Sequence, residues 1–321
     1  MSNVKVGDPL LEIRHLTKEF LVEDGRILRA CDDVSLTAHK GQTLGIVGES
    51  GCGKSTLMRT ITQIHAATNG EVLFHGEDIL KNKGEKARQN RKYIQMVFQD
   101  PTAAFNPKMR IKDIICEPLL NFGIISKSEV DSKAMELLEM VELPTEFKDR
   151  YPHNMSGGQR QRVGIARALA LEPEIIICDE ATSALDVSVQ RTICELLVRL
   201  QKEKGITYLF ICHDLALVSL ISHKVAVMYL GNVVEIMPAE SMHDDCRHPY
   251  TQALMKAVFN VDVKAEAKIE VLEGELPSPM DIPAGCPFQT RCVYCMDICR
   301  QEKPILKMID DRHQVACHLV K

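Results

Sequence analysis

Residues 48–56 read Gly48-Glu49-Ser50-Gly51-Cys52-Gly53-Lys54-Ser55-Thr56. They satisfy the pattern G-x-x-x-x-G-K-[ST], follow the apolar run Thr43–Val47 and precede a helix predicted over Ser55–Gln63. Glycines allow the backbone to wrap closely around a phosphate chain. The helix N-terminus and the Lys54 ammonium add positive charge, and the Ser55 hydroxyl can bind Mg²⁺. The stretch therefore predicts nucleotide phosphate binding, against the alternative of a glycine-rich turn that only connects a strand to a helix.

The composition is that of an ordinary globular chain. Its 321 residues are 45% hydrophobic and 26% charged, with a formal net charge of −5. These values exclude a disordered or collagenous chain and give no reason to expect a nucleic-acid partner. The longest apolar runs, such as Tyr208–Cys212, are far shorter than the roughly 18 residues of a membrane span. No apolar secretory core follows Met1, so we expect a protein that stays in the cytosol.

Strand-like and helix-like segments alternate over residues 1–240, which predicts an α/β domain with a mostly parallel sheet. Periodicity weakens after Pro238, so we place a domain boundary near residue 240, before a loop-rich region over 241–321. Strands are expected at Leu10–Arg14, Val34–Thr37, Thr43–Val47, Val72–Phe74, Ile94–Phe98, Ile175–Cys178, Tyr208–Cys212, Val225–Tyr229 and Val233–Met237. Further helices are expected at Ile111–Val141 with breaks at Pro118 and Gly123, and at Ser156–Leu171, Val187–Lys202 and Tyr250–Phe259.

Two acidic residues follow the apolar run Ile175–Cys178. A bound triphosphate needs an acid on the metal side and a group that orients water. Asp179 is placed to hold Mg²⁺ and Glu180 to polarise the attacking water. The alternative is a pair of solvated acids that cap the helix which follows.

A second glycine motif reads Met155-Ser156-Gly157-Gly158-Gln159. It resembles the signature motif of ABC-type ATPases, usually written Leu-Ser-Gly-Gly-Gln, with Met155 in the Leu position. A helix that begins at Ser156 offers exposed N–H groups and a hydroxyl to an anion, although a plain N-cap would use the same residues. The resemblance implies that the signature of one subunit closes over the triphosphate held by the other subunit's phosphate loop.

Further residues match marks of the same family in the family's order. Gln99 matches the Q-loop glutamine, which senses Mg²⁺ and the transmembrane partner. Ser183-Ala184-Leu185-Asp186 matches the D-loop at the dimer interface, and His213 matches the switch histidine near the γ-phosphate. The resemblance implies that Lys54 stabilises charge in hydrolysis. Phe20 is our candidate for the aromatic ring that stacks on adenine, with a core Phe as the alternative.

The resemblance extends over about residues 10–320 and implies a fold. That fold is a RecA-like parallel sheet plus an N-terminal antiparallel sheet, with a helical subdomain over about 100–168 and a small C-terminal extension. Gln99-Asp100-Pro101 and His248–Leu254 are similar to the oligopeptide/dipeptide importer branch, and the intact signature is most like its second ATPase subunit.

The implied function is ATP hydrolysis that energises peptide import at the cytoplasmic face of the membrane. The implied partners are a second homologous ATPase subunit or a second copy in a head-to-tail dimer, two transmembrane permeases and, indirectly, an extracytoplasmic solute-binding protein. An importer of nickel or another small solute, from the same branch, is the main alternative. A soluble ABC ATPase is another, although the chain lacks the coiled-coil insertions or second cassette of such proteins. A pure binding module would not need both Glu180 and His213.

The 12 cysteines form two groups. Those before residue 250 are scattered, often inside apolar runs, and are interpreted as small buried hydrophobes. The others follow the spacing Cys286-x5-Cys292-x6-Cys299-x17-Cys317, with Cys295 as an extra sulfur that could replace one ligand. This spacing resembles the tail that holds a structural [4Fe–4S] cluster in the importer branch. A tetrahedral Zn²⁺ site and metal-free packing of reduced cysteines are the alternatives.

Overall fold

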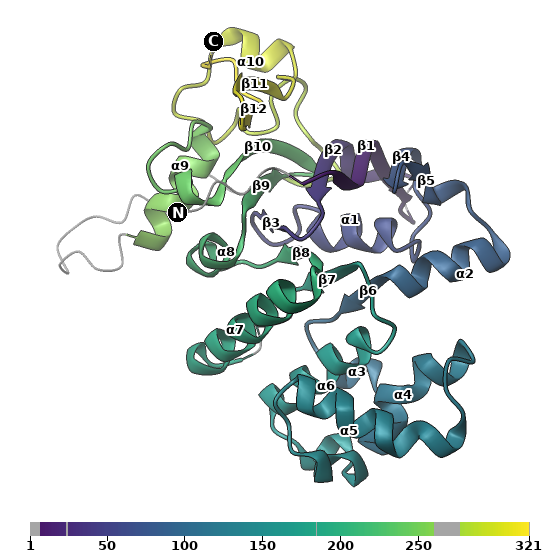
Figure 1. Cartoon of the computed structure of the whole chain (residues 1–321). Coiled ribbons are helices and arrows are strands. Elements are labelled where there is room, and N and C mark those ends of the chain that lie inside the picture. Colours follow the sequence, from purple (N-terminus) through teal and green to yellow (C-terminus); the bar gives the residue numbers. More distant parts are fainter. Residues whose placement is uncertain (1–6, 24, 184, 260–276, 321) are drawn as a thin grey trace. The chain divides into compact units, whose positions relative to one another are not determined.

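The computed structural model describes residues 7–23, 25–183, 185–259 and 277–320. The chain divides into two compact units, and Figure 1 shows the elements of both. The first unit comprises Met1–Gly7, Lys40–Gln42 and Asn82–Phe210, and the second comprises Asp8–His39, Thr43–Lys81 and Ile211–Lys321. Within the described ranges, no helix is both long and apolar enough to span a bilayer.

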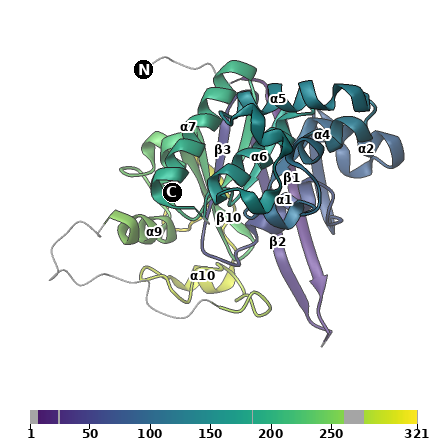
Figure 2. The same ribbon diagram turned by 90° about the horizontal axis from the view of Figure 1, so that it is seen from below.

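The second unit contains the expected N-terminal antiparallel sheet, with strand order β2-β1-β4-β5. Its strands are β1 (Pro9–Leu21), β2 (Ile27–His39), β4 (Asn69–Phe74) and β5 (Glu77–Asp78). Figure 2 shows β1 and β2 as a long hairpin. The sequence predicted only the apolar parts of these two strands, because charged residues such as Lys18, Glu19 and Arg29 continue both of them beyond the buried region.

The second unit also contains the strand that leads into the phosphate loop. Here β3 (Thr43–Val47) pairs in parallel with β9 (Lys224–Tyr229), and β9 forms the expected hairpin with β10 (Asn232–Pro238). Two short strands from the C-terminal region extend this side, β12 (His313–Val315) beside β10 and then β11 (Lys307–Asp310). The remaining helices of the unit are α1 (Lys54–Ile61), η1 (Ile79–Lys81), α8 (Leu215–Ile221), η5 (Ala239–Ser241), α9 (Pro249–Phe259) and α10 (Asp297–Gln301).

The first unit contains strands in the order β8-β7-β6. These are β6 (Ile94–Val97), β7 (Ile175–Asp179) and β8 (Thr207–Ile211), whose last residue belongs to the second unit. All residues of β7 and β8 are buried, which agrees with their continuous apolar sequence. The helices of the unit are α2 (Gly84–Tyr93), α3 (Pro101–Ala104), α4 (Ile111–Asn121), η2 (Lys127–Glu129), α5 (Val130–Met140), η3 (Thr145–Asp149), η4 (Pro152–Asn154), α6 (Gly157–Leu169) and α7 (Val187–Lys204).

The prediction that Pro118 breaks a helix is wrong. Pro118 lies inside α4, which continues to Asn121. The helix buries Ile111 and Leu119 on either side of the proline, and this packing outweighs the lost backbone hydrogen bond. The helix does end near Gly123, which has a φ of 67° and was the other expected break.

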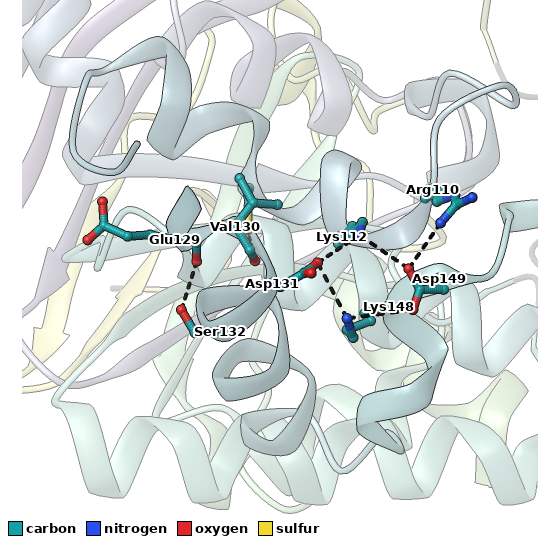
Figure 3. Close-up of polar contacts among 9 residues, drawn as sticks. Arg110, Lys112, Glu129, Val130, Asp131, Ser132, Lys148 and Asp149 are labelled. Atoms are coloured by element: carbon teal, nitrogen blue, oxygen red, sulfur yellow. Dashed lines mark hydrogen bonds and ion pairs between the residues drawn. The ribbon is translucent and has the colours of Figure 1, made fainter. Parts of the chain in front are cut away.

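Charged side chains join α4, α5 and η3 in the helical part of the first unit (Figure 3). Lys112 Nζ lies 2.7 Å from Asp131 Oδ1 and 3.2 Å from Asp149 Oδ1. Lys148 and Arg110 complete the cluster, 3.4 Å from Asp131 and 3.2 Å from Asp149 respectively. Hydrogen bonds from Lys112 lower the pKa of both carboxyl groups. The cluster therefore stabilises this helix packing when the carboxylates are ionised, and that stabilisation is lost as acid protonates them.

Candidate functional site

The structure places the predicted phosphate loop between β3 and α1, the strand and helix that the sequence predicted around it. Gly48, Gly51 and Gly53 have φ angles of 150°, 78° and 104°. Such angles are open to glycine and strained for other residues, so these glycines set the course of the loop. Ser55 and Thr56 follow in the first turn of α1, and that turn contains no acidic residue. The N-terminus of α1 is therefore electrostatically suited to an anion.

Lys54 is held within the loop itself. Its side chain is buried, and Nζ donates hydrogen bonds to the carbonyl oxygens of Gly48 at 2.8 Å and Glu49 at 2.9 Å. A third neighbour is the Cys52 sulfur, 3.7 Å away. The ammonium group is thus fixed beside the same backbone that the motif predicts will surround a phosphate chain.

Two glycines of the loop lie against other strands at very short range. A Cβ on Gly53 would lie 2.0 Å from the Ala30 carbonyl oxygen on β2, and one on Gly48 would lie 2.2 Å from the Met228 carbonyl oxygen on β9. The Gly231 N–H also donates to the Cys52 carbonyl at 2.9 Å. The loop is therefore packed tightly against the strands of its own unit, and its glycines are required for space as well as for conformation.

The C-terminal region contacts the loop through Glu49. The Glu49 N–H donates to the Tyr250 hydroxyl at 2.9 Å. Arg291 binds the Glu49 carboxylate with both terminal nitrogens, Nη1 at 2.8 Å and Nη2 at 3.1 Å. The sequence motifs did not indicate either residue as part of the site. The available signals were the position of Tyr250 within His248–Leu254 and of Arg291 next to Cys292.

The other predicted nucleotide residues of the second unit lie at its surface. His213 is exposed between β8 and α8, whose first turn is capped by Asp214 Oδ1 accepting from the Leu217 N–H at 3.0 Å. Phe20 is half-buried on β1, where its ring centroid lies 5.4 Å from that of His65. Because the Phe20 ring is not buried, packing in the core does not account for it. Its role in stacking on adenine stays a prediction.

In the first unit, Gln99, Asp179 and Glu180 lie at the same edge of the sheet. Strands β6 and β7 are parallel with Val97 opposite Cys178, and Gln99, Asp179 and Glu180 follow at their carboxyl ends. Asp179 is buried, and Glu180 has a φ of 51°, a strained value for a residue with a side chain.

The helix-capping alternative for these acids is wrong. The next helix, α7, begins only at Val187, and its N-cap position is held by Asp186 rather than by Asp179 or Glu180. The two acids therefore lie at the end of a buried strand and are not the N-cap of α7, and their metal and water-orienting roles stay predictions.

The signature residues begin α6, as predicted. Ser156 is the N-cap; its hydroxyl accepts from the Gln159 N–H at 3.3 Å, and Gln159 Oε1 accepts from the Ser156 N–H at 2.9 Å. A Cβ on Gly158 would lie 2.6 Å from Val189 of α7, and one on Gly157 would lie 3.3 Å from Leu185. The plain N-cap alternative is thus correct as local structure, and the predicted anion site at the same residues is compatible with it.

The D-loop lies beside the signature. Gln190 Nε2 donates to the carbonyl oxygens of Thr182 and Leu185, each at 3.0 Å, which fixes the turn before α7. Asp186 is exposed there, and Ala184 lies outside the described residues. The structure therefore gathers Q-loop, acid, signature and D-loop residues in the first unit, and phosphate-loop and switch-histidine residues in the second.

Four of the five C-terminal cysteines line one small cavity: Cys286, Cys292, Cys299 and Cys317. Cys295 is not among its lining residues, and its sulfur lies 3.7 Å from the Met296 carbonyl oxygen. Burial raises the pKa of Cys286 to about 12, and it also raises the pKa of Cys292 and Cys317. Backbone hydrogen bonds act in the opposite direction on these three thiols, from Phe288, Tyr294, Leu319 and Val320.

A close backbone contact brings two of the cavity cysteines together. The Cys286 N–H donates to the Cys299 carbonyl at 2.7 Å. Gly285 has a φ of 80°, and a Cβ there would lie 2.4 Å from the same carbonyl oxygen. Only glycine permits this approach, so Gly285 is part of what assembles the cysteine group.

Glu235 on β10 joins several segments of the C-terminal region through buried contacts. It is fully buried, and His313 Nε2 on β12 lies 2.8 Å from its Oε1. Its carboxylate also accepts from the N–H groups of Arg247 at 2.6 Å and His248 at 3.2 Å. Burial lowers the pKa of His248 to about 4. His248 is therefore neutral at neutral pH, and its Nδ1 accepts from the Tyr250 N–H at 3.1 Å in the first turn of α9.

Comparisons with known proteins identify the class. Residues 31–183 match the model of the ABC transporter family. The structure of cbiO1 from Clostridium perfringens, part of an ABC transporter complex, is 29% identical, with a TM-score of 0.64 over 73% of this chain and 90% of that one. The ATP-binding cassette MJ0796, in a dimer bound to ADP and phosphate, is 31% identical, with a TM-score of 0.65 over 71% and 98%. The fold and the motifs are those of an ABC transporter ATPase, which confirms the predicted fold class and activity.

Residues 234–299 match a second model, the C-terminal region of oligopeptide/dipeptide transporters. A probable peptide ABC transporter ATP-binding protein of Sinorhizobium fredii is 48% identical over 98% of this chain and 91% of its own length. The oligopeptide transport ATP-binding protein AppF of Bacillus subtilis is 48% identical over 97% and 98%. The chain belongs to the oligopeptide/dipeptide group of ABC transporter ATP-binding proteins, and the predicted resemblance is confirmed.

Proposed function

We propose that this chain hydrolyses ATP to energise an oligopeptide importer. The observation that carries the proposal is the presence, in one chain, of a phosphate loop and of an oligopeptide-type C-terminal region whose Tyr250 and Arg291 contact that loop. The nickel alternative has less support, because the relatives above are named for peptide transport. A soluble, non-transport ABC ATPase also has less support, because residues 234–299 match the C-terminal region of oligopeptide/dipeptide transporters.

The proposed roles in hydrolysis follow from position and chemistry. Lys54 and the loop N–H groups bind the phosphates, with Ser55 and Asp179 as Mg²⁺ ligands. When bound, Mg²⁺ neutralises part of the charge on the phosphates. Glu180 accepts a proton from the attacking water, and His213 hydrogen-bonds the γ-phosphate. Gln99 is a further Mg²⁺ ligand, and the Phe20 ring stacks on adenine.

Ser156, Gly157, Gly158, Gln159 and Asp186 are proposed to face the nucleotide of a second ATPase subunit in a head-to-tail dimer. Their placement supports this, because the α6 N-terminus and the D-loop lie together with Gly157 close to Leu185. The dimeric structure of MJ0796 with ADP and phosphate is consistent with such a pair. The partner is a second copy of this chain or a homologous subunit.

The proposed site of action is the cytoplasmic face of the membrane. Closure of the ATPase dimer there would move two permease subunits. Next to Gln99, a cavity in the first unit is lined by residues of β6, α3 and α6, including Arg167, and by Phe98 and Phe105, which follow β6 and α3. A short permease helix docking there would connect transport to the Q-loop. The solute-binding protein would act only through the permeases.

The test of this function is transport. The chain is reconstituted in proteoliposomes with two permeases, a homologous ATPase subunit and a solute-binding protein of this importer group. These vesicles should take up a radiolabelled tripeptide in an ATP-dependent manner. Vesicles without the solute-binding protein are the control. ATP-dependent accumulation of ⁶³Ni²⁺ without peptide uptake would contradict the peptide assignment and support the nickel alternative.

We further propose that Cys286, Cys292, Cys299 and Cys317 hold a structural [4Fe–4S] cluster. The donor set fits, because four thiols line one cavity and backbone hydrogen bonds act to lower the pKa of three of them, against the effect of burial. Such hydrogen bonds stabilise thiolates, the form that binds metal. Zinc uses the same four thiolates and is the alternative.

Iron analysis after anaerobic purification tests the cluster. We expect about four iron atoms and four sulfides per chain, with loss of most of the iron in Cys286→Ser. Cys295→Ser is the matched control and should keep the iron, because Cys295 does not line the cavity. One zinc per chain without iron would contradict the cluster, and iron loss in Cys295→Ser would contradict the ligand set.

A further inference from the structure

The segment between two cavity cysteines reaches the phosphate loop. Cys286 and Cys292 both line the cavity, and the residues between them include Phe288 and Arg291. Phe288 is buried, with its ring centroid 5.4 Å from that of Tyr250 and 5.2 Å from that of Tyr229. Both ends of this short segment therefore lie at the cysteine group, while Phe288 packs against Tyr250 and Arg291 binds Glu49 of the loop.

Arg291 makes the strongest of these contacts. Its side chain is only 6% exposed, and it forms a two-pronged ion pair with Glu49 at 2.8 and 3.1 Å. The carboxylate raises the pKa of the guanidinium further above its usual range. Paired parallel bonds of this kind fix orientation as well as distance. Removing either partner leaves the other charge poorly compensated in a largely buried place.

Glu49 connects this ion pair to the catalytic lysine. Its carboxylate is held by Arg291, its N–H by the Tyr250 hydroxyl, and its carbonyl oxygen accepts from Lys54 Nζ at 2.9 Å. A displacement of Arg291 therefore acts directly on the residue whose backbone positions Lys54. Among the groups in these contacts, only Lys54 is proposed to bind the phosphates of ATP.

We propose that Arg291 is a positioning residue for the phosphate loop, and that the state of the cysteine group controls nucleotide binding through it. The inference rests on the proposed function, because it takes the loop as the ATP site and the four cysteines as metal ligands. With metal bound, the segment Cys286–Cys292 is held at both ends and Arg291 is placed on Glu49. Loss of the metal releases the segment Cys286–Cys292 and weakens the ion pair between Arg291 and Glu49 that supports the loop.

Nucleotide affinity of the full chain tests the role of Arg291. We expect Arg291→Met to weaken binding of a fluorescent ATP analogue with Mg²⁺ by about tenfold. Arg291→Lys keeps the charge but not the paired geometry, and it should give a smaller loss. Arg300→Met removes an exposed arginine from the same region and is the matched control. Melting temperatures of all variants show whether a loss comes from unfolding. Equal affinity in folded Arg291→Met and wild type would overturn the proposal.

A double-mutant cycle tests the connection to the cysteines. Cys286→Ser should weaken ATP binding in the wild-type background, and much less in the Arg291→Met background, because the path through Glu49 is already broken. Additive losses, or full ATP affinity in metal-depleted Cys286→Ser, would overturn the control by the cysteine group. Metal analysis of each variant separates this failure from that of the cluster proposal. A wild-type chain that binds no ATP would overturn the proposed function and the inference together.

Discussion

Glu180→Gln should reduce steady-state ATP hydrolysis by about 100-fold or more, with ATP binding retained. Glutamine has the same size but cannot accept a proton from the attacking water. Glu180 directly follows the fully buried strand β7 and has a φ of 51°, and the substitution keeps the size of its side chain. The substitution should therefore leave the local structure intact and remove only the proton acceptor.

The measurement is phosphate release by the assembled ATPase, together with size-exclusion chromatography in ATP. We expect the variant to accumulate as an ATP-bound dimer, because binding closes the pair and hydrolysis no longer opens it. Glu195→Gln removes an exposed carboxylate on α7 that pairs with Arg191, and it should leave turnover unchanged. Turnover in Glu180→Gln equal to that of Glu195→Gln would remove Glu180 from the mechanism.

Gly53→Ala should abolish measurable ATP binding and destabilise the chain. A Cβ at this position would lie 2.0 Å from the Ala30 carbonyl oxygen, and the φ of 104° is unfavourable for any residue with a side chain. The strained φ alone costs about 1–2 kcal/mol, and the contact with a backbone atom forces the loop away from β2. We expect the loop N–H groups to lose their common direction, with ATP affinity at least about 100-fold weaker.

Gly51→Ala is the matched control for this prediction. Gly51 also has a positive φ, 78°, but a Cβ there would meet nothing within 4 Å. It should therefore show the same conformational cost, about 1–2 kcal/mol in the free energy of unfolding, without a collision with backbone atoms, and a smaller loss of ATP affinity than Gly53→Ala. Isothermal titration with Mg-ATP and chemical denaturation compare the two variants. Equal ATP affinity in both would show that the close approach to Ala30 is not required.

The sequence predicted the parts of the structure whose cause is local. The β3–loop–α1 order followed from an apolar run, three glycines and a lysine, and the start of α6 followed from the capping residues Ser156 and Gln159. Gly205, in the left-handed conformation, ends α7 about where it was expected. Strand lengths were less accurate, because charged residues on exposed strands carry no apolar periodicity.

The contacts that the sequence did not predict join distant residues. Glu49 and Arg291 are 242 positions apart, and neither residue alone indicates a partner. From the sequence alone, Glu235 is an acidic residue on a predicted hairpin. Only the structure shows that it is buried against His313 and the backbone of His248. The prediction for Pro118 was wrong for the opposite reason. The packing of α4 outweighs the local tendency of proline to end a helix. The domain boundary near residue 240 stays a prediction.

The order of synthesis gives the contact between Glu49 and Arg291 a temporal consequence. The loop emerges from the ribosome early, whereas Arg291 and strand β12, which pairs with β10 through Glu235 and Val315, emerge much later. Domains begin to fold as they are made. A chain that stops before Arg291 therefore carries the whole phosphate motif but lacks the ion pair with Glu49 that we propose positions it.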